Sequence, residues 1–490
     1  MTFNARLHSL CPKFLFTISL AASAPSSSGQ ELEIRTSAES AILTWPGDEL
    51  LFVSPTLEDF QLVEAQSPFE VSIAETERLF FQLRSLPTIQ TPLDGSTIGT
   101  ELIDIQGLVG AFSSFEDLSI TINGQNAQIE TSAAESTFLL RDFALSPGVN
   151  TLTVVFSTPE GVQQTQALSV TFVPVTANNI VIAGDYAYAA QSTEGLAAIN
   201  LKTRELTIAT TGNNIVPRVD DLSFDGRFLF TLNAGSTANA LSTFSLAEPA
   251  QPSLVSGPVS AISGFFSGVS AANGRVAVAG GTSSLQVRNY NTETGAIANQ
   301  SSSLDFVIGH PDVLLSADGE LAHVSVDFPN NNFRFGISTV NLNDPPAAST
   351  VGPAFGLTDL DGDFSLSSGG QDPTNFGVES ALINERLLVT SGNQLSILSS
   401  DGSSLQGSLN IGFFTINVDG DNDTSAFVVG ALNGVPQLAE IDLTNPNSPT
   451  LAATTAFPGA GQFTGVAVND DYIVIAANEG GLRIIDRAAH

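Results

Sequence analysis

Carboxylates at alternate positions are the first feature of this 490-residue sequence that points to chemistry. In LTDLDGDFSLSSGGQDPT, residues 357–374, Asp359, Asp361 and Asp363 occupy every second position, and Asp372 follows. Ca²⁺ prefers carboxylate oxygens, and alternation can direct three of them at one ion. Counted from Asp359, however, glycine stands at the fourth position, whereas an EF-hand loop needs it at the sixth. Two interpretations stay open: a calcium site at Asp359, Asp361 and Asp363, or a solvated turn.

Histidine offers few candidates for catalysis. His8 lies in the amino-terminal segment and His490 is the last residue, so His310 and His323 are the candidates for a histidine base. His323 alternates with apolar residues in ELAHVSVDF, which is typical of a packed or surface strand position. No G-x-S-x-G, H-E-x-x-H, P-loop or dinucleotide-binding motif occurs. Paired carboxylates for glycoside hydrolysis stay open, because spacing along the chain does not give separation in space.

The charge of the chain disfavours two classes of partner. There are 50 acidic residues against 16 Lys and Arg, a formal net charge of −34. This charge repels nucleic-acid phosphates and anionic lipid headgroups, so we expect neither nucleic-acid binding nor electrostatic docking on a membrane. We interpret the acid excess as a source of solubility, with a cationic partner as the alternative.

The first residues predict export from the cell. MTFNARLHSLCPKFLFTISLAASA places Arg6 and Lys13 before an apolar run and small residues after it, as in a secretory signal peptide. We expect residues 1–29 to be removed together with Cys11, the single cysteine, which leaves no disulfide or thiolate site. No later stretch is long and apolar enough for a transmembrane helix. The expected location is secreted: extracellular, on the cell surface or in the periplasm, without membrane insertion.

Short alternating apolar runs bounded by Gly, Asn, Asp and Pro predict an all-β protein. In a first region, residues 30–85, a hairpin signal occurs at Pro46–Asp48 and the last strand is Phe80–Arg84. The region resembles a small accessory β module of secreted bacterial proteins that ends in an FFRLR-like strand. Trp45 is interpreted as a core residue of this module, with a sugar-stacking role as the alternative.

Residues 86–176 predict a β-sandwich of about seven short strands. Turn signals stand at Asp94-Gly95, Asn123-Gly124 and Pro147-Gly148. The pieces TPLDGSTIG, ITINGQNAQI and FALSPGVNTLTVVFSTPEG resemble the bacterial Ig-like module that also accompanies secreted glucodextranase-type enzymes. That resemblance implies a spacer or docking surface without catalytic groups.

Residues 177–490 repeat a hairpin unit seven times, at about 45 residues per copy. That is the length of a four-stranded propeller blade. Each copy alone exposes an apolar face, so we expect the copies to stack around a common axis as a seven-bladed β-propeller. The last copy has strands for three positions. The run ALSVTFVPVTANNIVIA, residues 167–183, is predicted to supply the fourth strand and close the ring.

A family resemblance is specific at residues 439–487, AEIDLTNPNSPTLAATTAFPGAGQFTGVAVNDDYIVIAANEGGLRIIDR. This segment resembles the LVIVD repeat of secreted and surface bacterial β-propellers, and STFSLAEPAQPSLVSG, residues 242–257, is a weaker echo. The resemblance implies the fold and a role in extracellular interaction or scaffolding. It transfers no catalytic residues.

The spacing of turns locates the Asp359 run. From Asp318 to Asn384 it is 66 residues, against 40–48 for the three preceding turn-to-turn intervals, so about 20 residues form an insertion between the fourth and fifth copies. That connection shares a face with VDFPNNNF, residues 326–333, and insertions on one face of a repeat fold commonly bind partners. His310, in IGHPD, is placed at the channel mouth. The predicted binding residues are Asp327, Asn330, Asn331, Asn332, Asp359, Asp361, Asp363 and Asp372.

Two functions are compatible with these patterns. The first is a non-enzymatic propeller, secreted or on the cell surface, that binds an extracellular protein or polysaccharide through its loop-rich face, with the β modules as spacer. The alternative is a metal-assisted extracellular hydrolase or lactonase that uses the propeller channel, with the Asp359 run or His310 contributing. Calcium is the one candidate cofactor. The missing metal and nucleophile signatures favour the first function.

Overall fold

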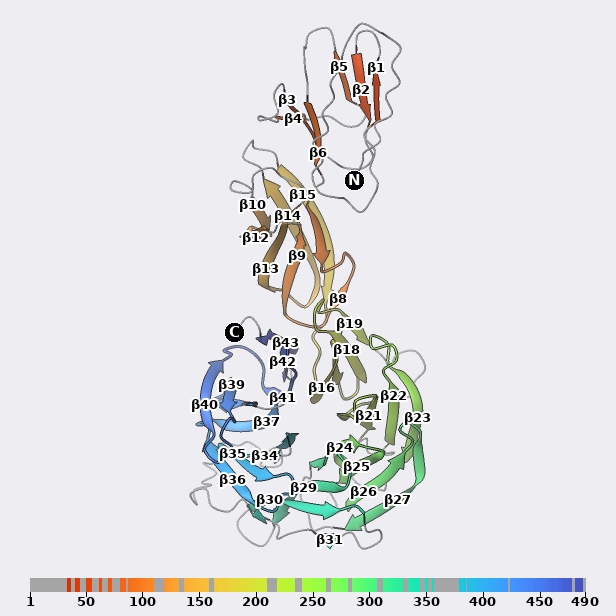
Figure 1. The fold of residues 1–490 in the computed structure, drawn as a ribbon, viewed down its shortest axis with the longest axis vertical. Coiled ribbons are helices and arrows are strands. Elements are labelled where there is room, and N and C mark those ends of the chain that lie inside the picture. Colours follow the sequence, from red (N-terminus) through yellow and green to blue (C-terminus); the bar gives the residue numbers. More distant parts are fainter. Residues whose placement is uncertain are drawn as a thin grey trace. The chain divides into compact units, whose positions relative to one another are not determined.

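The computed structural model consists of β-strands throughout the part that it describes (Figure 1). No helix is formed by these residues, and none could therefore cross a membrane as a helix. The all-β prediction is confirmed for them. The described residues are 33–36, 40–44, 50–54, 61–63, 69–72 and 80–84, with backbone only, and 87–109, 119–131, 136–157, 163–208, 218–233, 240–260, 266–280, 284–305, 312–328, 334–343, 349–350, 355–356, 379–384, 386–421, 424–477 and 481–487.

The chain divides into two compact units: residues 1–96 with 102–171, and residues 97–101 with 172–490. The first unit begins with two three-stranded sheets, ordered β1-β2-β5 and β4-β3-β6. The predicted strand Phe80–Arg84 is confirmed, whereas Trp45, Pro46–Asp48 and residues 1–29 lie outside the described residues. The strand bounds are Glu33–Thr36 (β1), Ser40–Thr44 (β2), Leu50–Ser54 (β3), Gln61–Val63 (β4), Phe69–Ser72 (β5) and Phe80–Arg84 (β6).

Two further sheets complete the first unit, one ordered β12-β13-β9-β7 and the other containing β11-β10-β14-β15. Both contribute buried side chains, among them Ile105 and Phe156. Asn123 and Gly124 adopt left-handed φ angles of 47° and 83° in the turn between β10 and β11, as their sequence predicts. The bounds are Thr88–Thr91 (β7), Leu102–Leu108 (β9), Ser119–Ile122 (β10), Gln125–Asn126 (β11), Gln128–Thr131 (β12), Ser136–Ala144 (β13), Gly148–Ser157 (β14) and Gln163–Phe172 (β15).

The second unit contains seven sheets among its described residues, each built from strands consecutive in the chain and paired antiparallel. Their bounds are Asn179–Ala183 (β16), Tyr186–Ala190 (β17), Leu196–Asn200 (β18) and Leu206–Ile208 (β19); Asp221–Phe224 (β20), Phe228–Asn233 (β21), Ala240–Ser245 (β22) and Ser253–Ser260 (β23); Phe266–Ala272 (β24), Arg275–Gly280 (β25), Ser284–Tyr290 (β26) and Ile297–Asp305 (β27); Val313–Leu315 (β28), Leu321–Phe328 (β29), Arg334–Asn341 (β30), Ser349–Thr350 (β31) and Phe355–Gly356 (β32); Glu379–Ile383 (β33), Arg386–Ser391 (β34), Gln394–Ser399 (β35) and Leu405–Asn410 (β36); Phe414–Gly420 (β37), Ser425–Leu432 (β38), Val435–Asp442 (β39) and Thr450–Ala456 (β40); and Phe463–Val468 (β41), Tyr472–Ala477 (β42) and Gly481–Asp486 (β43).

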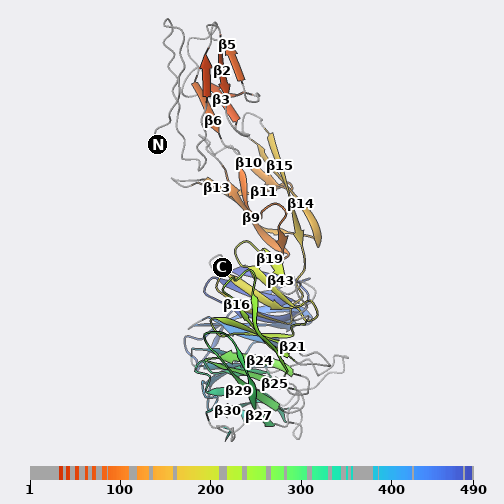
Figure 2. The same ribbon diagram turned by 90° about the vertical axis from the view of Figure 1, so that its right-hand side faces the viewer.

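The first strands of these sheets follow one another around a ring (Figure 1), which Figure 2 shows from the side. In order, β16, β20, β24, β28, β33, β37 and β41 each contact the next, and β41 contacts β16. A buried apolar cluster lies at each of the seven junctions between neighbouring sheets. The apolar face that each sequence copy carries is therefore buried against its neighbour, which is the main source of stability for this unit.

The ring closes differently from the sequence prediction. Ala167–Phe172 lie in β15 of the first unit's sheet, and Asn179–Ala183 form β16, so this run does not complete the last sheet and that prediction is wrong. Alternation identifies a strand but not its partner, and the two-residue turn at Gly184 and Asp185 pairs β16 locally with β17.

Residues Thr97–Glu101 instead lie along the outer edges of the first and last sheets, where the ring closes. This closure segment includes Thr97–Ile98 (β8), and Thr100 forms a parallel bridge to Leu482 of β43. Ile98 is fully buried, bridges Glu205, and its carbonyl accepts the Val173 amide at 2.9 Å. The Arg483 guanidinium pairs with the Glu101 carboxylate at 3.0 Å.

Candidate functional site

The predicted calcium ligands Asp359, Asp361 and Asp363 lie outside the described residues, as do Asp372, Asn330, Asn331, Asn332 and His310. Their place in the chain agrees with the predicted insertion, because residues 357–378 connect β32 of the fourth sheet to β33 of the fifth. Asp327 is the seventh residue of β29, opposite Phe335 of β30, and its side chain is not described. The structure therefore does not test whether these side chains converge.

His323 is a packed strand residue, as its sequence context indicates. It is fully buried in β29, and its Nδ1 lies 2.9 Å from the Thr339 hydroxyl on β30. Burial lowers the pKa of His323 to about 4, so the imidazole is neutral near pH 7. A neutral, buried ring inside a sheet interface offers no route to substrate.

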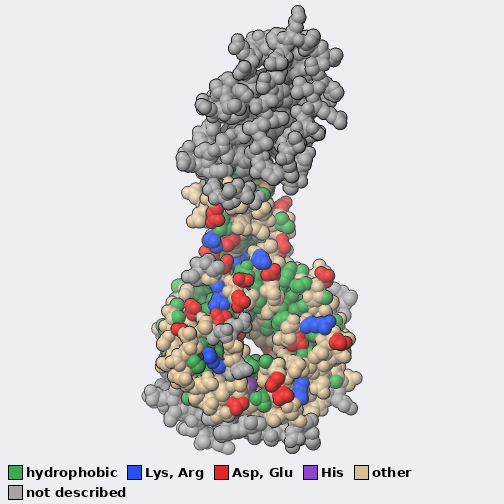
Figure 3. All heavy atoms as spheres, viewed as in Figure 1, with side chains coloured by type: hydrophobic (Ala, Val, Ile, Leu, Met, Phe, Trp, Pro, Cys, Tyr) green, Lys and Arg blue, Asp and Glu red, His purple; other side chains and the backbone are tan. Residues whose placement is uncertain are grey.

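The groups with the strongest chemical potential lie on the first strands of the ring. Asp221 and Glu379 begin β20 and β33, Asp312 immediately precedes β28, and Asp419 lies within β37. Asp221 is 7% exposed and the other three are half-buried. We call these four residues the inner-strand carboxylates. Figure 3 shows the surface of the second unit hollowed at its middle, where the first strands meet.

Side chains on one first strand accept hydrogen bonds from backbone amides of the next. A first strand is an edge strand, and its outward N–H groups have no strand partner, so buried ones need another acceptor. Asp221 Oδ2 accepts from Val269 N at 2.6 Å, and Asp419 Oδ2 accepts from Val468 N at 2.8 Å. Three further side chains do the same, at 2.9–3.2 Å: Ser223 to Ala271 N, Ser270 to Leu315 N and Asn417 to Val466 N.

The remaining junctions carry hydrogen bonds between the same strands. Asn179 Nδ2 donates to Asp221 Oδ1 between the first and second sheets. Ser380 Oγ donates to Asp312 Oδ2 at 3.1 Å, and Asn417 Nδ2 to Glu379 Oε2 at 3.3 Å. At the closing junction, Thr464 Oγ1 donates to the Ala177 carbonyl at 2.5 Å. A side chain of a first strand, or of the residue next to it, thus bonds across every junction of the ring.

Burial makes these carboxyl groups hold protons unusually well. Burial raises the pKa of Asp221 and of Asp419 to about 6. It also raises the pKa of Asp312, with the charge of Asp221 as the second cause. Burial, followed by the charges of Asp312 and Asp221, raises the pKa of Glu379 well above its usual range. Asp221, Asp312 and Glu379 are therefore close enough to repel one another when ionised.

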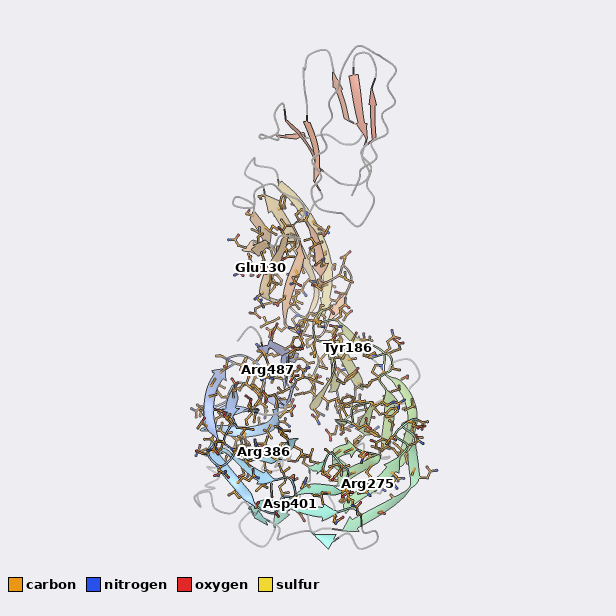
Figure 4. All side chains as sticks on the ribbon, in the orientation of Figure 1. Glu130, Tyr186, Arg275, Arg386, Asp401 and Arg487 are labelled. Carbon is orange, nitrogen blue, oxygen red and sulfur yellow. The ribbon has the colours of Figure 1, made fainter. Side chains whose placement is uncertain are left out.

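Arginines bond between sheets at the opposite ends of these strands. Arg275 donates to the Gly319 carbonyl at 2.7 Å and to Asn343 Oδ1 at 2.9 Å, and Arg386 donates to the Leu443 carbonyl at 3.3 Å. Arg487 pairs with Asp421 at 2.6 Å. Figure 4 shows Arg275, Arg386 and Arg487 on three different sheets. These three arginines, in a chain with only 16 Lys and Arg, thus form bonds between neighbouring sheets of the ring.

Asp421 lies at a turn in a second acidic run, VDGDNDTSAF, residues 418–427. Its carboxylate accepts from the amides of Thr424 and Ser425, at 3.1 and 2.8 Å, in the connection between β37 and β38. Asp423 lies outside the described residues. Asp419 is different, because it faces the next first strand rather than the turn.

The arrangement supports hydrogen bonding and proton retention more directly than metal binding. Among the residues that the structure describes, no group of three or more His, Cys, Asp or Glu is arranged to hold a metal ion. A cavity of about 340 Å³ lies elsewhere, against the first two sheets, with Tyr188, Phe224 and Arg227 in its lining. The Tyr188 hydroxyl donates to the Pro249 carbonyl at 2.9 Å beside it.

Sequence reasoning did not single out Asp221, Asp312 or Glu379. The available signal is a polar residue at the start of some first strands, as in DLSF and ESALI. The donor and acceptor are 45–49 residues apart in the chain, so a comparison of equivalent positions between successive repeats is needed to find them.

Comparison with protein families identifies the LVIVD repeat at residues 176–199 and 460–486. These matches cover the first three strands of the first sheet and the three strands of the last, which pack together in the cluster of Ala187, Val474 and Leu482 at the closure. The resemblance drawn from residues 439–487 is confirmed over 460–486, and the chain is consistent with a propeller-like repeat protein. The matched residues do not include the weaker echo at 242–257.

Solved structures give a distant likeness. A chain of the "Crystal Structure of Mitotic Checkpoint Complex" aligns with a TM-score of 0.46 and 11% identity, over 63% of this chain and 89% of that one. The computationally designed Ika8 protein aligns with a TM-score of 0.42 and 11% identity, over 70% and 94%. No curated protein matches the sequence.

Proposed function

We propose that this chain is a secreted or cell-surface binding protein: a seven-bladed β-propeller that follows an Ig-like sandwich and a small β module. It binds an extracellular protein or polysaccharide through the end of the ring that carries its longest connections, with the β modules as spacer. The seven consecutive sheets, their cyclic contacts and the two LVIVD matches support the propeller assignment.

The distribution of connection lengths carries the binding proposal. In a ring of antiparallel sheets, connections from second to third strand and from one sheet to the next lie at one end. That end has connections of 12 residues, 209–220, and of 22 residues, 357–378. At the other end no connection between described strands exceeds seven residues. Long connections on one face of a rigid repeat scaffold are where binding surfaces develop.

The inner-strand carboxylates support a binding role over a catalytic one. Asp221 and Asp419 accept backbone amides of the next sheet, while Asp312 and Glu379 accept side-chain donors. A carboxylate that holds a neighbouring strand is not free to move toward a substrate. The ring is thus a rigid support, and the variable connections supply recognition.

The test compares two loop variants of residues 30–490. One replaces residues 357–374 with a short Gly-Ser linker; the matched control replaces residues 445–448, at the other end, with Gly-Ser of equal length. Both variants are assayed on a glycan array. They are also cross-linked to proteins in the culture medium of the organism that makes the chain. We expect saturable binding that the first variant loses and the control keeps. Equal binding by both variants would contradict the assignment of this face.

The hydrolase alternative has one observation in its favour, the raised pKa of Asp312 and Glu379, because such carboxyl groups suit general acid catalysis. Assay of residues 30–490 against ester, lactone and glycoside panels tests it, with Glu379→Gln as the variant. Turnover that this variant abolishes, while folding is intact, would establish the alternative.

The proposed calcium site has a separate test. Thermal unfolding is measured with calcium, with magnesium at equal ionic strength and with chelator, because any cation screens a chain of net charge −34. A calcium-specific rise in Tm that disappears when Asp359, Asp361 and Asp363 become Asn would support the site. An equal response to magnesium identifies the run as a turn.

A further inference from the structure

The outer strand of the sixth sheet, β40, is unusually open. All seven residues of Thr450–Ala456 are exposed, on both faces of the strand. Its inner edge pairs with β39, and no strand pairs with its other edge in the described residues. A free strand edge presents N–H and C=O groups that can pair with another chain, so proteins usually shorten, interrupt or cover such edges.

The other outer strands described in the ring show those protections. β19 has three residues and β31 has two. β23 contains Pro258, which has no N–H, and two register irregularities against β22. A Cβ added at Gly407 of β36 would lie 2.1 Å from the Pro446 carbonyl, so the following sheet's loop rests on that strand. β27 has a register irregularity against β26, and its Ile297 amide donates to Ser256 of β23 at 3.0 Å.

β40 lies in an uncharged stretch of the chain. No charged residue occurs from Leu443 to Asn469, although the chain as a whole carries 66 charged residues. Charges on a strand are a common means of preventing edge pairing, and β40 has none. In a protein of net charge −34, this neutral strip is a place where a second, equally acidic copy can approach with little local repulsion.

The strand is also compatible with its own sequence in the antiparallel direction. A two-fold axis at Ala453 places Ala453 opposite itself, Leu451 opposite Thr455 and Ala452 opposite Thr454. None of these pairs opposes like charges or two bulky groups, and Leu451, which is 43% exposed, gains a β-branched neighbour. Small side chains let the two backbones approach to the usual sheet spacing.

We propose that β40 is a self-association strand, through which two copies of this protein join β40 to β40 in an antiparallel, two-fold arrangement. The shared sheet would have eight strands, four from each copy. The interface is small compared with a stable dimer of 1,200 Å² or more, so the association is weak, with a Kd on the order of 10 µM or higher. This inference does not depend on the proposed binding role.

Sedimentation velocity of residues 30–490 tests it over a wide concentration range, in about 0.15 M salt to screen the net charge. The wild-type chain is compared with Ala453→Glu and Ala453→Lys, each of which places like charges face to face at the two-fold axis. Ser253→Glu on the protected strand β23 is the matched control. Both positions tolerate a polar side chain, because Ala453 and Ser253 are exposed.

We expect concentration-dependent dimerisation of the wild type and of Ser253→Glu, and at least tenfold weaker association of each Ala453 variant. An equimolar mixture of Ala453→Glu and Ala453→Lys should recover the dimer, because the opposed charges now attract. That recovery is specific to β40 meeting β40. A wild type that stays monomeric to about 100 µM, or a dimer that neither Ala453 variant weakens, would overturn the proposal.

Discussion

The innermost and outermost strands of the ring are both sheet edges, yet their free hydrogen-bonding groups have different partners. On the inner edges, side chains such as Asp221 and Asp419 accept amides of the neighbouring sheet. At the closure, Thr97–Glu101 covers the outer edge of the last sheet. β40 has neither protection. Edges that hold the ring together are thus satisfied within the chain, while one outer edge stays available to a partner.

The largest expected effect separates a covered outer edge from an open one. Ile98→Ala removes a fully buried side chain at the closure and should lower the free energy of unfolding by about 2–5 kcal/mol. Leu451→Ala on β40 removes a half-exposed side chain and should change it by less than about 0.5 kcal/mol. Urea unfolding of both variants measures the difference. Similar losses would mean that the closure segment does not stabilise the ring.

A loss of about 2–4 kcal/mol is expected for Asp221→Ala, because two donors, Val269 N and Asn179 Nδ2, lose their acceptor in a buried place. The control is Asp442→Ala, whose carboxylate is exposed and, within the described residues, accepts from the nearby Thr444. That variant should leave the urea midpoint unchanged. If Asp221→Ala were equally silent, the inner-edge bonds would be incidental to stability.

The pH dependence of stability should distinguish the inner-strand carboxylates from the carboxylates at surface turns. The pKa of Asp221 and of Asp419 is about 6 in the folded protein against an ordinary 3.8, so the folded state binds these protons more tightly than the unfolded chain. Their stabilising contribution is complete below about pH 4 and is lost as the pH rises through about 6. The shift corresponds to about 2–3 kcal/mol for each carboxyl group.

The measurement is the difference in unfolding free energy between the wild type and Asp221→Asn/Asp419→Asn from pH 4 to pH 8. The wild type should lose stability relative to the variant between pH 4 and about 6, and the difference should then be constant. Asp318→Asn should give a nearly constant difference over this range, because the hydrogen bond from Ser316 lowers the pKa of Asp318, and the contribution of that carboxyl group changes only below about pH 4. A difference independent of pH would show that the inner carboxyl groups titrate normally.

Local pattern made the strands and turns of the ring predictable, and it failed where partners are distant. Asn384 stands at a predicted turn and adopts a left-handed φ angle of 49°, and Asn273 adopts 43° at the corresponding turn of the third sheet. The length of each sequence copy also predicted one sheet per copy. The apolar face of each copy predicted that these sheets pack against one another. By contrast, Asp221 looks like an ordinary polar strand residue until Val269, 48 residues later, is placed beside it.

The closure shows the same limit. Residues 167–183 have a clear strand pattern. The last part of this run, β16, pairs with β17 through a short hairpin turn, so it does not join the last sheet as predicted. The segment that does cover the closure, Thr97–Glu101, is short and has no periodic pattern of its own. Its function depends on contacts with Glu205 and Leu482, more than 100 residues away.

The smallest predicted effect concerns the arginines at the opposite ends of the strands. Arg275→Met keeps the aliphatic contacts of the side chain but removes its bonds to the Gly319 carbonyl and Asn343. Because the head group is half exposed and water can replace part of each bond, we expect a loss of about 0.5–1.5 kcal/mol in urea unfolding. Lys202→Met removes an ion pair with Asp185 within the first sheet, and both partners are exposed, so it should have no measurable effect. If Arg275→Met lowered the free energy of unfolding more than Asp221→Ala, the comparison would be reversed. The arginine bonds would then stabilise the ring more than the side-chain bonds between inner strands.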